Sequence, residues 1–93
     1  MFVKIISLTL FIHDALTLKD KRQIVKSILE KTHQKFNAAT AEVGYQDQWQ
    51  RSQLGIALVG NSPSHLDSVR QELLGMIEGQ YPVEVTECVV NDY

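Results

Sequence analysis

The chain has 93 residues, of which 44% are apolar and 22% charged, and its formal net charge at pH 7 is -2. This balance is typical of one globular domain over residues 1–93 and excludes a disordered chain. No apolar run approaches the roughly 18 residues of a membrane-spanning helix, and the N-terminus lacks the pattern of a secretory signal, so we expect a soluble cytoplasmic protein without membrane contact.

Residues 2–12 are expected to form the first strand. Apolar residues occupy the even positions of this segment, with Lys4 as the exception, as in a strand that buries one face. The odd positions are mixed rather than polar, which suggests that the second face is partly covered as well.

A helix is expected from about Leu18 to Phe36. Thr17 and Asp20 have the spacing of a capping box, which satisfies free amides in a first helical turn. Apolar residues then recur at helical spacing and predict one buried stripe: Ile24, Val25, Ile28, Leu29 and Phe36.

The remaining segments predict two strands, a helix and a last strand. Residues 38–45 and 52–60 are expected to form a hairpin, and Asn61 or Ser62 can cap a helix that starts at Pro63. Residues 83–90 alternate again after Gly79 and Pro82. The order predicts an α+β, ferredoxin-like βαββαβ fold, with a four-stranded antiparallel sheet and two helices on one face.

Basic residues are concentrated on the first helix. Six of the nine Lys and Arg residues lie between positions 19 and 35, and Lys19, Arg22 and Lys26 fall opposite the apolar stripe. We call these three the basic ridge. They could bind the phosphates of RNA, although a solvated helix face would have the same pattern.

The hairpin is the second concentration of functional side chains. Trp49 could stack on a base, and Arg51 could bind a phosphate or a carboxylate. Alternatively, Trp49 packs on the end of the sheet or on another copy of the chain, and Arg51 pairs with an acidic neighbour.

No catalytic residue is proposed from the sequence. It contains no glycine-rich phosphate loop, no nucleophile elbow and no cysteine-histidine signature, and its three histidines are not spaced as metal ligands. We therefore expect a protein that is not an enzyme and holds no metal or cofactor.

Two stretches resemble a known family. They are Leu18-Lys19-Asp20-Lys21-Arg22 with Lys26-Ser27, and Ala41 to Arg51 with Leu54-Gly55. Both are similar to the bacterial YlxP-like family, domain of unknown function 503. The resemblance implies a ferredoxin-like fold, no established catalytic activity and a suspected link to RNA or the ribosome.

Two functions remain open at this point. The first is a non-enzymatic accessory protein that contacts ribosomal RNA or a ribosomal subunit through Lys19, Arg22, Lys26, Trp49 and Arg51. The second is a homo-oligomeric module that binds a small ligand or a protein. It would use the second sheet face, whose residues are Val3, Ile5, Phe11, Gly55, Ala57 and Val59.

Overall fold

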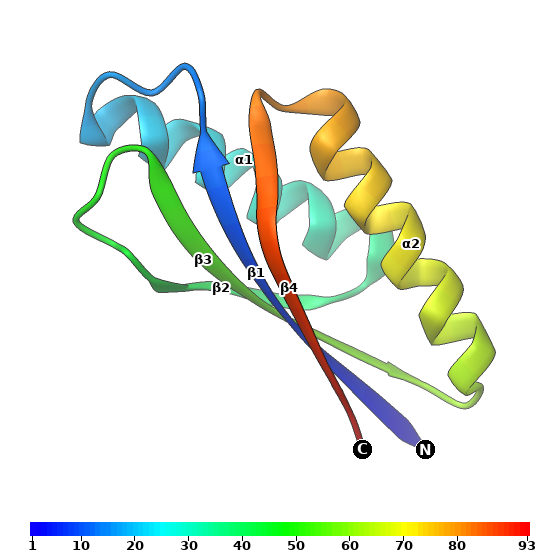
Figure 1. Cartoon of the computed structure of the whole chain (residues 1–93). Helices are drawn as coiled ribbons and strands as arrows, with labels where there is room; N and C mark the ends of the chain where they lie inside the picture. The colour runs from blue at the N-terminus through cyan, green and yellow to red at the C-terminus, as the bar shows by residue number, and fades with distance from the viewer.

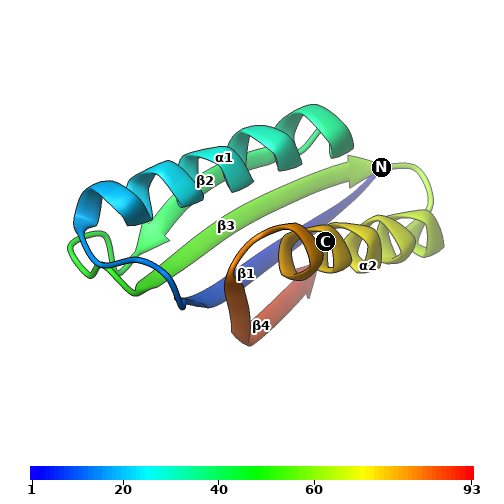
Figure 2. The same ribbon diagram turned by 90° about the horizontal axis from the view of Figure 1, so that it is seen from above.

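Six elements follow one another in the order β1, α1, β2, β3, α2, β4 in a computed structural model that describes all 93 residues (Figure 1). Their bounds are Phe2–Ile12 for β1, Leu18–Phe36 for α1, Ala39–Gly44 for β2, Arg51–Gly60 for β3, Pro63–Gln80 for α2 and Val83–Asp92 for β4. The strands form one antiparallel sheet in the order β2-β3-β1-β4. Both helices lie on the same side of this sheet (Figure 2), so the predicted fold is confirmed.

Local signals fix the ends of both helices. Thr17 Oγ1 accepts a hydrogen bond from the Asp20 amide at 3.1 Å, and Asn37 ends α1 in the left-handed conformation with φ 52°. Ser62 caps α2, and Pro63 occupies its first turn, where no amide hydrogen is needed. These contacts confirm the predicted start and end of α1 and the predicted start of α2.

The core lies between the helices and one face of the sheet. The alternate residues of β1 and β3 point toward the helices and meet apolar side chains of α1 and α2. The fully buried members from these four elements are Ile6, Leu8, Leu10, Ile12, Leu54, Ile28, Leu73 and Ile77. Neither helix combines the length and the apolar character needed to cross a lipid bilayer.

Strand ends differ slightly from those expected. β4 extends to Asp92 rather than Val90, because Val3 and Tyr93 exchange two backbone hydrogen bonds at 2.9 and 2.8 Å. β3 begins one residue early at Arg51, which pairs with Phe11. β2 is two residues shorter than predicted.

Candidate functional site

The basic ridge is exposed on α1, beside the edge strand β2. Lys19, Arg22 and Lys26 are all exposed. Thr40 Oγ1 on β2 donates to the Leu29 carbonyl of α1 at 3.1 Å, which holds the helix along this strand (Figure 2). The predicted ridge is therefore present as a surface.

A groove of about 400 Å³ separates α1 from β2. Its lining mixes the two signs of charge: it consists of Arg22, Val25, Lys26, Leu29, Glu30 and Glu42. The two carboxylates weaken the positive potential that the sequence pattern alone predicts for this side of α1.

A buried ion pair lies behind this groove, and it was missing from the sequence-based prediction. The side chain of Lys21 is fully buried, and its Nζ lies 3.1 Å from Glu42 Oε2. Lys21 also donates to the backbone carbonyl of Tyr45, while Ser52 Oγ donates to the same Glu42 carboxylate. These contacts tie α1 to both strands of the hairpin. One signal was available, because Lys21 falls on the same side of the helix as the buried Val25 and Ile28.

The hairpin presents an aromatic and cationic surface. The guanidinium of Arg51 lies 4.2 Å from the centre of the Tyr45 ring, and its Nη2 donates to the Tyr45 hydroxyl at 3.4 Å. Trp49 is 44% exposed. Tyr45 has φ 57°, so the chain turns sharply as it leaves β2. The sequence allowed for an acidic partner of Arg51, but its partner is Tyr45.

Arg51 and the basic ridge lie on different sides of the sheet. Ser52 is fully buried beneath the helices, so its neighbour Arg51 points to the opposite face. The hairpin is held next to α1 by Lys21, yet Arg51 does not extend the surface formed by Lys19 and Arg22. The predicted RNA-binding residues therefore form two surfaces.

The face of the sheet away from the helices is open, and we call it the open face. The register of β1 against β3 pairs Val3 with Val59 and Ile5 with Ala57. All six residues expected to share this face do so by strand alternation: Val3, Ile5, Phe11, Gly55, Ala57 and Val59.

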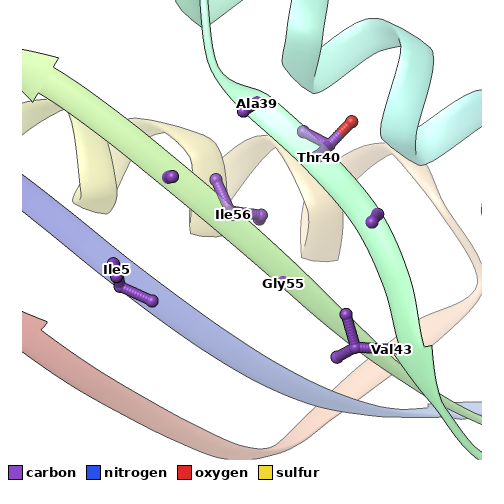
Figure 3. Close-up of a pocket in the computed structure, with 8 residues that line it drawn as sticks. Ile5, Ala39, Thr40, Val43, Gly55 and Ile56 are labelled. Carbon is purple, nitrogen blue, oxygen red and sulfur yellow. The ribbon is translucent and has the colours of Figure 1, made fainter.

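A hollow of about 280 Å³ lies on the open face and reaches the edge strand β2 (Figure 3). Val43 and Ile5 line it from either side, and a Cβ added to Gly55 would come within 3.2 Å of the Val43 side chain. The contribution of β2 was missed. Its small or apolar alternate residues Ala39, Ala41 and Val43 were the available signal.

A second buried cation lies at the other end of the sheet. Lys4 points inward with the apolar residues of β1, and its Nζ lies 2.8 Å from Asp67 on α2 and also bonds Asp92 on β4. The hydrogen bond to Asp67 is the main reason why the pKa of Lys4 is raised, followed by the bond to Asp92. The same bond to Lys4 lowers the pKa of Asp67. These two carboxylates explain why a charged residue can occupy an inward-facing position of β1.

These shifts predict how stability depends on pH. Asp67 stabilises the fold above its ordinary pKa of 3.8, and this contribution is lost as the pH falls through the lowered value. Lys4 stabilises the fold below its ordinary pKa of 10.5, and this contribution is lost as the pH rises through the raised value. We expect the difference in unfolding free energy between the parent and Asp67→Asn to be constant from about pH 5 to pH 9 and to shrink in acid. Urea titrations across this range would measure it, and a difference that grows in acid would contradict the assignment.

No group of three or more His, Cys, Asp and Glu side chains is arranged to hold a metal ion. The surfaces considered for binding are the basic ridge with its groove, the hairpin and the open face.

Comparison with known proteins identifies relatives without a described activity. The model of the family described as "Protein of unknown function (DUF503)" matches residues 3–90. The "Uncharacterized protein YlxP" of Bacillus subtilis (strain 168) is 41% identical over 75 residues, which cover 81% of this chain and 82% of that protein. A solved structure titled "Structural Genomics, protein YJCS" matches 96% of each chain with a TM-score of 0.62 at 14% identity, and it supports the fold alone.

Proposed function

Because the chain belongs to the DUF503 family, whose description gives no activity, we propose a function from its geometry. The chain is a non-catalytic binding module that associates with a second copy of itself through the open face. The observation that carries this proposal is the set of large apolar side chains exposed there. Ile5 is 41% exposed, Val43 56% and Val59 65%.

The size of the open face suits such an association. β1 has 11 residues, β3 and β4 have 10 each and β2 has 6. With a rise of roughly 3.3 Å per residue and a strand spacing of roughly 4.8 Å, they give a face of roughly 600 Å². This area is close to the roughly 800 Å² that each partner buries in a standard interface. The exposed apolar side chains on this face include Ile5, Val43 and Val59, and a cluster of this kind on a surface often marks an interaction site.

Charges at one end of the open face favour a second copy as the occupant. Phe11 on β1 is flanked by Arg51 on β3 and by Glu84 on β4. A two-fold axis that runs parallel to the strands, between two stacked sheets, places β3 of one copy against β4 of the other. Arg51 of each copy then approaches Glu84 of the other copy. This complementarity supports one relative orientation of the two sheets.

Ile5→Lys tests the proposal, because it places a charge at the centre of the open face. We expect the mass in light scattering to fall by half or more, while the thermal unfolding transition stays cooperative. Gln71→Lys, an exposed position on α2, is the matched control and should leave the mass unchanged. A parent chain that remains a monomer at all concentrations would contradict the proposal.

A second function, the binding of structured RNA or a ribosomal subunit, is supported by the basic ridge. Lys19, Arg22 and Lys26 are exposed on one side of a single helix, which can follow a phosphate backbone. Arg51 lies on a separate surface, so it would add a contact only to an RNA that wraps around the hairpin.

Co-sedimentation with ribosomes over a salt series separates the two functions. With about three phosphate contacts, the slope of log affinity against log salt should be very roughly -2 to -3. Lys19→Glu with Arg22→Glu should abolish binding, whereas Lys31→Glu should not, because Lys31 is turned toward Gln80 of α2. Equal co-sedimentation of the folded double variant and the parent would eliminate the RNA function.

A further inference from the structure

The two edges of the sheet differ in how well they are protected. Each edge strand has a row of backbone groups that no neighbouring strand pairs, although the Glu42 carbonyl of β2 accepts a bond from Gln46 Nε2 at 3.3 Å and the Val85 amide of β4 donates to Glu78 at 3.5 Å. Charged residues usually prevent such a row from pairing with another chain. β4 carries the exposed carboxylates of Glu84, Glu87 and Asp92. β2 has no lysine or proline, and its one acidic residue, Glu42, is already bound by Lys21. β2 is therefore the edge that is open to pairing.

The register along β2 is regular where an added strand would bind. Ala39 through Glu42 pair in sequence with β3, and the irregularity follows only between Glu42 and Gly44. On the open face, Ala39, Ala41 and Val43 form a stripe of small and apolar side chains that another strand would extend.

The helix beside this edge carries a charge pattern that complements itself. Lys26 and Glu30 are both exposed, lie about one turn apart on α1 and line the groove against β2. When two α1 helices run antiparallel, Lys26 of each faces Glu30 of the other. Opposite charges then meet twice across a two-fold axis.

We infer that β2 is a second self-association surface, on which two copies pair their β2 strands antiparallel about Ala41. This register places Thr40 opposite Glu42 of the second copy. A register centred on Glu42 would instead place two carboxylates directly opposite each other, which is destabilising. The product is one continuous sheet of eight strands, with the two α1 helices side by side over its centre.

The β2 interface uses backbone groups at the edge of the sheet, whereas the open face uses side chains on its surface. Pairing through β2 therefore stands without the association proposed for the open face.

Light scattering on a small set of variants tests the inference at low salt, where surface charges are least screened. We expect the parent to have at least twice the 10.5 kDa mass of the chain. Glu30→Lys places like charges opposite each other at the β2 interface and should lower the mass at least twofold. Lys26→Glu combined with Glu30→Lys should restore it. Glu72→Lys, at an exposed position on α2, is the matched control.

The variants separate failure of this interface from failure of the open face. A mass that falls with Ile5→Lys but not with Glu30→Lys overturns the β2 interface and retains the open face. The reverse result supports the β2 interface and overturns the open face, and a monomeric parent overturns both.

Hydrogen exchange gives a second measurement: the amides of residues 39–42 should exchange more slowly as concentration rises, and unchanged rates would contradict the pairing. The RNA test leaves Lys26 in place, so the two experiments are independent.

Discussion

Lys21→Met is expected to lower the free energy of unfolding by about 3 to 5 kcal/mol. The side chain of Lys21 is completely buried, and its ammonium binds both the Glu42 carboxylate and the Tyr45 carbonyl. Removing it leaves the charge of Glu42, whose side chain is only 19% exposed, with Ser52 as its only remaining side-chain partner. The loss of one partner of a buried pair costs far more than the loss of an exposed charge.

Urea unfolding followed by circular dichroism would measure this change, with Lys19→Met as the matched control. Lys19 precedes Lys21 by two residues on the same helix but is exposed, so its replacement should change stability by less than about 0.5 kcal/mol. The double variant Lys21→Met, Glu42→Gln should recover part of the loss, because no unpaired charge remains. Equal stability of Lys21→Met and Lys19→Met would show that the pair does not stabilise the fold.

The elements of this fold could be predicted because their signals are local. Thr17 and Asp20 stand three positions apart and make the cap contact that their spacing indicates. Pro63 similarly marks the first turn of α2. The alternation along β1 identified the face that packs against the helices, since neighbouring side chains of a strand always point to opposite faces.

The buried cations could not be assigned from the sequence because their partners are distant along the chain. Lys4 and Asp92 are 88 positions apart and meet only because β4 pairs with β1. Lys21 meets Glu42 because α1 packs against β2. A charged residue within an apolar pattern indicates that a partner exists, but tertiary structure determines which residue it is.

The open face was predicted for β1 and β3 but not for β2. Alternation assigns residues to a face within each strand, and this was enough for Ile5 and Ala57 to be placed together. The hollow beside Val43 depends on the register between β2 and β3 and on the absence of a side chain at Gly55. The separation of Arg51 from the basic ridge follows from the burial of Ser52 beneath the helices, which turns Arg51 to the opposite face.

Ile28→Ala is expected to destabilise the protein by about 2 to 5 kcal/mol. Ile28 is fully buried and belongs to the apolar cluster between α1 and the sheet. Truncation removes three carbon atoms from a densely packed region, which loses their transfer free energy and leaves a cavity that neighbours fill only in part. α1 also carries the basic ridge and Lys21, so loosening this helix would disturb both surfaces.

Chemical unfolding of Ile28→Ala and of Val69→Ala would test whether the loss in unfolding free energy depends on how deeply the side chain is buried. Val69 on α2 packs against the same cluster but is only partly buried, and its truncation removes less apolar volume. We therefore expect a clearly smaller loss for Val69→Ala, with an unchanged dependence on denaturant in both variants. Equal losses would indicate that α2 anchors the sheet as strongly as α1. A loss below about 1 kcal/mol for Ile28→Ala would mean that α1 is not fixed to the sheet through this residue.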